Sequence, residues 1–186
     1  MLAWIILFGV LFPVLFIFIS WIVTKSGKLE NKTFRIPLIL TGIIFLGGMV
    51  VVLPFVPQPR LVNLYLRFAV GIPLAVFGIA FRIYPLIYFR RMKTRSDLVR
   101  PSKLVINGPY SIVRHPQYVG GIIFIIGWFL IWGGLYSFYI LPVLIIMILL
   151  QAFIEEKYIL EKEFGNEYRE YKKKVGMFLP KVRRKG

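Results

Sequence analysis

The chain has 186 residues, of which 58% are hydrophobic, 24 are basic, 8 are acidic and none is cysteine, and its formal net charge is +16. Soluble domains average about 45–50% apolar residues, so this composition indicates an integral membrane protein. The lack of cysteine excludes disulfides, thiolate catalysis and cysteine-ligated zinc, and the single histidine excludes a histidine-rich metal site. We therefore expect no metal and no nucleic acid among the partners, and we assign the positive charge to loops that face anionic lipid.

Apolar stretches of about 20 residues can cross a bilayer as helices. The first, at 2–23, has no basic leader and no small-residue cleavage site, so we expect a retained helix and not a removed signal peptide. The expected fold class is an all-α integral membrane protein with a cytoplasmic cofactor-binding loop, at about 90–114, and an amphipathic C-terminal tail. A single domain, 1–186, would contain five transmembrane helices at about 2–23, 36–56, 61–89, 115–132 and 137–157.

The third predicted helix has two features of interest. Gly71, Ala75 and Gly78 share one face, a pattern that favours close approach of another membrane helix. Arg82 follows four residues after Gly78, and an arginine inside a membrane helix needs a partner. Arg82 is therefore expected to be either a site residue or a structural partner of a helix end. Pro73 and Pro85 are expected to kink this helix.

The distribution of basic residues predicts the orientation. Three segments, 24–35, 90–114 and 157–186, hold 21 of the 24 lysines and arginines, and five alternating helices would place them on one side. The positive-inside rule then puts the N-terminus outside, the C-terminus in the cytoplasm and the site on the cytoplasmic face. A charge-free Gly133–Gly134 hairpin would lie on the opposite side.

A histidine-bearing turn precedes the fourth predicted helix. His115 is followed by Pro116, and proline favours the first helical position, so His115 should lie at the helix N-terminus, where backbone N–H groups attract anions. Tyr118 lies one turn further on the same face, and Arg114 adds charge. Taken alone, His115 could be simply a helix cap.

Two adjacent acids follow an uncharged stretch, 121–154, which forms a predicted helical hairpin. The hairpin would return Glu155 and Glu156 to the side of His115. Neighbouring helical residues point about 100° apart, so one acid can face the interior while the other faces solvent or the tail. Taken alone, the two acids could merely mark the membrane boundary.

Taken jointly, RHPQYVG at 114–120, the paired acids and FGNEYREY at 164–171 resemble the isoprenylcysteine carboxyl methyltransferase family, whose wider relatives include membrane phospholipid methyltransferases. The resemblance implies S-adenosylmethionine as methyl donor, with S-adenosylhomocysteine as product, bound within about 102–175. It implies that the donor is bound by Lys103, Leu104, Val105, Tyr110, His115, Pro116, Gln117, Tyr118 and Glu156.

The resemblance also implies a reaction, carboxyl O-methylation of a prenylcysteine-like lipidated substrate that enters sideways from the bilayer, without an obligate protein partner. Family members that methylate prenylated cysteine carry an arginine where this chain has Ala152. Arg82 or Arg114 could replace it, and Glu155 is the third candidate catalytic residue. N-methylation of a phospholipid headgroup, S-methylation of a small thiol, and a non-enzymatic membrane scaffold or small transporter are the alternatives.

Overall fold

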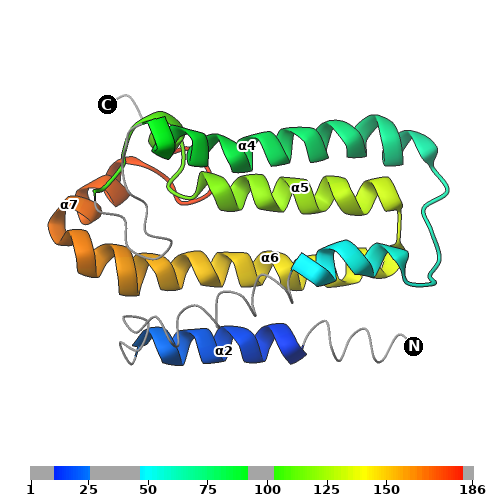
Figure 1. Cartoon of the computed structure of the whole chain (residues 1–186), viewed down its shortest axis with the longest axis horizontal. Helices are drawn as coiled ribbons and strands as arrows, with labels where there is room; N and C mark the ends of the chain where they lie inside the picture. The colour runs from blue at the N-terminus through cyan, green and yellow to red at the C-terminus, as the bar shows by residue number, and fades with distance from the viewer. Residues whose placement is uncertain (1–10, 26–46, 92–102, 182–186) are drawn as a thin grey trace.

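The computed structural model describes residues 11–25, 47–91 and 103–181, and the regular structure in these ranges is helical, with isolated β-bridges and no strand. The all-α expectation is therefore confirmed for the described part of the chain. Figure 1 shows α4, α5, α6 and α2 running along the long axis of the molecule, with α7 at one end. The helices are α2 (Phe12–Lys25), η3 (Leu53–Phe55), η4 (Tyr65–Val70), α4 (Gly71–Arg91), η5 (Gly108–Ser111), α5 (Pro116–Trp132), α6 (Leu135–Glu155), η6 (Glu156–Leu160) and α7 (Glu161–Lys174).

Two helical stretches, Tyr65–Tyr88 and Leu135–Lys174, are long and apolar enough to cross a membrane. A third apolar helix, α5, has 17 residues. The start of the first predicted span, 2–10, and most of the second, 36–46, lie outside the described residues. Large apolar side chains on α4 are exposed, among them Phe77, Ile83 and Leu86. An outward-facing apolar surface of this kind suits contact with lipid.

The third predicted helix begins later than residue 61. Its first turns are the π-helical η4, and the Asn63 side chain accepts a hydrogen bond of 3.1 Å from the backbone N–H of Leu66. Leu61 instead donates its N–H to the carbonyl of Gly133 at 2.8 Å. The start shifts because Leu61 pairs with another segment and asparagine satisfies a free N–H at the start of the helix. Pro85 lies inside α4, as predicted.

The small-residue face of α4 packs closely against another helix, as predicted, and the structure shows that this helix is α5. A Cβ atom at Gly78 would lie 2.3 Å from the backbone nitrogen of Phe124, and one at Gly120 would lie 2.4 Å from the backbone nitrogen of Arg82. Only glycine permits two backbones to approach so closely. Figure 1 shows the two helices side by side along most of their length. This packing fixes Arg82 relative to the beginning of α5.

The hairpin between α5 and α6 forms at the predicted glycines. Gly133 has a left-handed conformation with φ of 66°, and its N–H donates to Phe129 at 2.8 Å. Side chains from both helices, together with helical residues 47–52 and η3, form a buried apolar cluster near this end. The cluster comprises Val50, Leu53, Phe129, Ile140 and Leu144. It holds α5 and α6 antiparallel, so the start of α5 and the end of α6 lie at the same end.

The last predicted helix extends well beyond residue 157. Helix α6 continues through the π-helical η6 into α7, which ends at Lys174, and the backbone departs from helical angles at Gly165, where φ is 52°. Tyr168 and Tyr171 on α7 are buried, whereas most of its charged residues are exposed, so the tail is amphipathic as predicted. The change in polarity after Glu155 marks the end of the apolar segment, not the end of the helix.

Candidate active site

The turn before α5 places His115 at the start of the helix. His115 is the N-cap residue, Pro116 is the first helical residue, and the His115 carbonyl accepts bonds of 3.1 Å from the N–H groups of Tyr118 and Val119. Proline suits this position because the first N–H groups of a helix have no intrahelical acceptor. The imidazole is buried and stacks on Tyr118, with a centroid separation of 5.3 Å.

The segment after α7 runs beside this turn. The N–H of Arg114 donates to the carbonyl of Gly176 at 2.8 Å, and the N–H of His115 donates to the carbonyl of Met177 at 3.1 Å. The ring centroid of Phe178 lies 5.8 Å from the centroid of the His115 imidazole. Residues 176–178 therefore cover the histidine, a contact that the sequence did not reveal.

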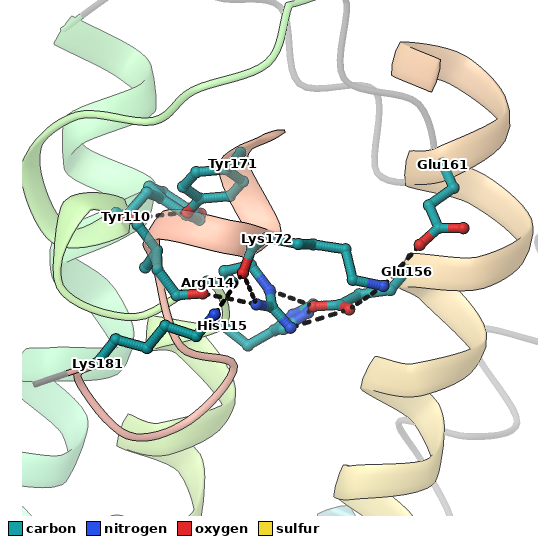
Figure 2. Close-up of polar contacts among 9 residues, drawn as sticks. Tyr110, Arg114, His115, Glu156, Glu161, Tyr171, Lys172 and Lys181 are labelled. Carbon is teal, nitrogen blue, oxygen red and sulfur yellow. Dashed lines mark hydrogen bonds and ion pairs between the residues drawn. The ribbon is translucent and has the colours of Figure 1, made fainter. Parts of the chain in front are cut away.

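Glu156 is the centre of the site. One carboxylate oxygen, Oε1, accepts from Nε of Arg114 at 2.7 Å and lies 3.0 Å from Nε2 of His115. The other oxygen, Oε2, accepts from Nη2 of Arg114 at 3.2 Å and lies 3.5 Å from Nζ of Lys172. The Glu156 side chain is only 4% exposed. Figure 2 shows these groups converging on the carboxylate from two segments, the turn before α5 and helix α7. Burial of a carboxylate is costly, and pairing and hydrogen bonding of this kind offset that cost.

Arg114 also binds the end of α7. Its Nη1 atom donates to the carbonyls of Val175 at 2.6 Å and Lys172 at 3.3 Å. Carbonyl groups at a helix C-terminus lack intrahelical donors and carry partial negative charge, so a guanidinium satisfies them well. Nζ of Lys181 donates to the same Lys172 carbonyl at 3.0 Å. Arg114 thus joins the helix start, the buried acid and the tail.

Lys172 bridges two acids. Its ammonium lies 2.6 Å from Oε1 of Glu161, in addition to the longer contact with Glu156, and its side chain is 35% exposed. It is therefore the most accessible of the three side chains that contact the Glu156 carboxylate. Lys172 lies outside the residues predicted for the site, although it follows Tyr168 of the FGNEYREY motif by one helical turn.

Glu155 faces a different neighbour. The hydroxyl of Tyr118 on α5 donates to Oε2 of Glu155 at 2.8 Å. The two adjacent acids therefore point to separate partners, as their angular separation predicts. Arg82 of α4 lies on the same side of α5 as Tyr118. A Cβ atom placed on Gly121, one turn after Tyr118, would be 2.6 Å from Nη1 of Arg82. Of the predicted catalytic residues, Arg82 and Glu155 thus lie near Tyr118, whereas Arg114 pairs with Glu156.

The predicted donor-binding segment before α5 lies beside α7. Gln117 donates to the hydroxyl of Tyr110 at 3.2 Å, and the hydroxyl of Tyr171 donates to the carbonyl of Tyr110 at 2.6 Å. Burial raises the pKa of Tyr110 well above its ordinary value, so this hydroxyl stays neutral near neutral pH. Leu104 packs on the cluster of Tyr168, Tyr171 and Val175, Val105 is half-buried, and Lys103 is exposed.

These features define a helical protein with membrane-type helices and a buried ionic site where α5, α6 and α7 meet. Residues 66–167, more than half of the chain, match the phospholipid methyltransferase family. The chain therefore belongs to this family. No solved structure matches the chain significantly.

Two curated proteins are similar to parts of the chain. The protein-S-isoprenylcysteine O-methyltransferase of Schizosaccharomyces pombe is 33% identical over 79 residues, which are 42% of this chain and 34% of that protein. The methanethiol S-methyltransferase of Pseudomonas deceptionensis is 38% identical over 109 residues, covering 50% of this chain and 36% of that protein. The chain thus matches about a third of the length of each relative.

Proposed function

We propose that this protein is an S-adenosylmethionine-dependent membrane methyltransferase whose reaction is carboxyl O-methylation of a prenylcysteine-like lipidated substrate. The observation that carries the proposal is the convergence of Arg114, His115 and Glu156, which come from motifs about 40 residues apart in the sequence. The family assignment and the names of both relatives support methyl transfer.

The polar groups of the site fit the chemistry of the proposed donor. S-adenosylmethionine carries a carboxylate, an ammonium, ribose hydroxyls and a sulfonium-bound methyl group, and it supplies that methyl group as an electrophile when bound. Arg114 and Lys172 could bind the donor carboxylate. Lys172 is the most distant partner of Glu156, at 3.5 Å, and also contacts Glu161. If Lys172 turned fully toward Glu161, Glu156 could accept a hydrogen bond from the ammonium or a hydroxyl of the donor. Tyr110 and Gln117 add neutral hydrogen-bonding groups beside them.

A carboxylate acceptor needs orientation and no general base. Carboxyl groups are ionised and nucleophilic near neutral pH. The work of the protein is then to hold the carboxylate oxygen in line with the methyl group and to exclude water. Such positioning can supply roughly 7–11 kcal/mol of the barrier. Buried groups fixed by ion pairs, as at Glu156, suit this task because they need not reorganise.

The topology proposed from the sequence is five membrane helices with the N-terminus outside and the site at the cytoplasmic face. Two contacts at the hairpin end support it. Arg60 forms a β-bridge with Gly134, and Nε of Arg67 donates to the carbonyl of Ile131 at 3.1 Å. These two arginines therefore lie at the end opposite Glu156 and the lysine-rich α7. The donor would enter from the cytoplasm and the lipid chain from the bilayer.

S-methylation of a small thiol is the second candidate. Ala152, which replaces the arginine of the prenylcysteine-specific members, is fully buried. The similarity to the methanethiol enzyme also extends over the longer segment of this chain. A thiol must lose its proton to become a strong nucleophile. The Tyr118–Glu155 pair, with its hydrogen bond of 2.8 Å, could accept that proton.

A panel of acceptors tests the proposal. The full chain, reconstituted in lipid with isotopically labelled donor, is offered a prenyl-thioether carboxylate, an aminophospholipid and a small thiol. The proposal expects label on the carboxylate, recovered as a base-labile methyl ester. Label on the thiol alone would favour the second candidate. Absence of both transfer and donor binding would favour a scaffold or transporter.

A further inference from the structure

The ammonium of Lys172 is shared unequally between two acids. Nζ lies 2.6 Å from Oε1 of Glu161 and 3.5 Å from Oε2 of Glu156. Figure 2 shows the ammonium between the two carboxylates. Because the attraction between two charges falls with distance, the contact with Glu161 is the stronger and the contact with Glu156 the weaker of the two.

Glu156 keeps its other partners when Lys172 leaves. Arg114 and His115 lie 2.7 and 3.0 Å from Oε1, and their side chains are 9% and 6% exposed, whereas that of Lys172 is 35% exposed. Arg114 is also fixed by the carbonyls at the end of α7. Lys172 is thus the partner that can move, and its move onto Glu161 would leave neither the lysine nor Glu156 unpaired.

The hydroxyl of Tyr168 is a second feature that points to a ligand beside Glu156. Tyr168 is 1% exposed, and its hydroxyl has no hydrogen-bond partner among the described residues, although the charge of Glu156 acts on it. Nζ of Lys172 lies 6.0 Å from the centroid of the same ring. A hydroxyl buried without a partner is costly. A ligand N–H that reached Glu156 could donate to this oxygen as well.

An ammonium is the ligand group that suits the place of Lys172. Exchange of one ammonium for another keeps the charge around Glu156 constant. An anion entering there would meet the charge of the carboxylate, and a neutral group would leave the buried acid with one cationic partner fewer. The amino-acid end of S-adenosylmethionine carries such an ammonium.

We infer that Lys172 is an exchangeable counter-ion: the ammonium of the methyl donor replaces it at Oε2 of Glu156, and Glu161 is the positioning residue that receives the displaced lysine. The inference rests on the proposed function, because it takes the donor as the ligand. It assigns Lys172 to the place of the donor ammonium and not to the donor carboxylate. Molecules with Lys172 on Glu156 exclude the donor, so the apparent donor affinity depends on how well Glu161 holds the lysine away.

A double-mutant cycle in the full chain tests the inference. Calorimetry measures the binding of S-adenosylhomocysteine, which has the same amino-acid end, to the wild type, Glu161→Gln, Lys172→Met and the double variant. We expect Glu161→Gln to weaken binding about two- to fivefold, because the displaced lysine then has no partner. Lys172→Met should tighten binding by a similar factor, because nothing has to be displaced. In the Lys172→Met background, Glu161→Gln should cause no further change.

A neighbouring ion pair provides the matched control. Lys173 lies 2.6 Å from Glu170, and both side chains are well exposed. Glu170→Gln and Lys173→Met should leave the affinity for S-adenosylhomocysteine unchanged. The analogue of this ligand with hydrogen in place of its amino group should bind Glu161→Gln and Lys172→Met as it binds the wild type, because it does not displace the lysine.

The opposite signs of the two effects separate exchange from a structural role. Weaker or unchanged binding by Lys172→Met, an equal effect of Glu161→Gln in both backgrounds, the same shifts with the deaminated analogue, or unfolding of Lys172→Met would overturn the inference. If the wild type binds S-adenosylhomocysteine while the cycle shows one of these results, the proposed function stands and this inference fails. If the wild type binds neither S-adenosylhomocysteine nor S-adenosylmethionine, the proposed function fails.

Discussion

Nε of Arg114 lies 2.7 Å from Oε1 of Glu156, although the two residues are 42 positions apart. The charge-free hairpin of α5 and α6 brings them together, because two antiparallel helices of similar length return the chain to the end from which it started. The pair joins the motif before α5 to the acids that follow α6. It also reaches α7, since Arg114 binds two of its terminal carbonyls.

Glu156→Gln should destabilise the protein by about 3–5 kcal/mol, because a neutral amide leaves the buried charge of Arg114 uncompensated. The side-chain amide of the glutamine would also direct N–H donors at the cationic groups of Arg114 and Lys172. Denaturant titration of the purified protein in detergent measures the change. Glu163→Gln, on the exposed surface of α7, is the matched control and should alter stability by less than about 0.5 kcal/mol. Equal stability of the two variants would show that the Glu156 cluster contributes nothing to folding.

Arg114→Lys should loosen the segment after α7 while keeping the charge. A lysine ammonium cannot reach both the carboxylate and the carbonyls of Lys172 and Val175. Loss of hydrogen bonds to a charged group costs about 1.5–3 kcal/mol. Hydrogen exchange at the amides of residues 114 and 115, which donate to Gly176 and Met177, should therefore accelerate at least tenfold. Arg169→Lys, at an exposed position, should leave these amides protected, and unchanged protection in both variants would refute the role of Arg114.

Gly127→Ala should destabilise the α4–α5 pair. The added methyl group would lie 2.4 Å from the backbone nitrogen of Ala75, which overpacks the interface at a cost of about 1–3 kcal/mol. Gly48→Ala is the control, since no atom of another described segment lies within 4 Å of a Cβ atom there and alanine favours a helix by about 0.5–1 kcal/mol. Thermal unfolding of the two variants should shift in opposite directions. A shift in the same direction would contradict the close packing.

The proposed topology can be tested with single cysteines, because the chain has none of its own. Arg60→Cys lies at the hairpin end and Lys173→Cys lies on α7, and both positions are exposed. A membrane-impermeant maleimide added to intact cells should label Arg60→Cys at once. It should label Lys173→Cys only after the membrane is permeabilised. The reverse pattern would place the site outside the cell.

The sequence predicted those features that local rules determine. The start of α5 follows from His115-Pro116, the hairpin from Gly133–Gly134, and the close contact of α4 with another helix from the spacing of small residues, although the sequence did not identify α5 as that helix. The continuation of α6 into α7 was missed because a change in polarity resembles a helix end, although glutamate and lysine are good helix formers.

The pairing within the site could not be predicted from sequence. Arg114, His115 and Lys172 can each pair with Glu156, and the approach of 176–178 to His115 depends on the tertiary fold. For this reason Arg114 was predicted to be catalytic and Glu156 to bind the donor, as if the two acted independently. The structure shows them in one ion pair. The roles of both residues in the reaction remain predictions.

The decisive measurement is the binding of S-adenosylmethionine to the purified full chain. Calorimetry is performed on the wild type, His115→Ala, Glu156→Ala and Glu163→Gln. If His115 and Glu156 bind the donor, the wild type and Glu163→Gln should bind it with equal affinity. His115→Ala and Glu156→Ala should bind it at least about tenfold more weakly, a loss of about 1.4 kcal/mol or more. Wild-type affinity in both site variants while they remain folded, or no binding by the wild type, would contradict this assignment of the donor site.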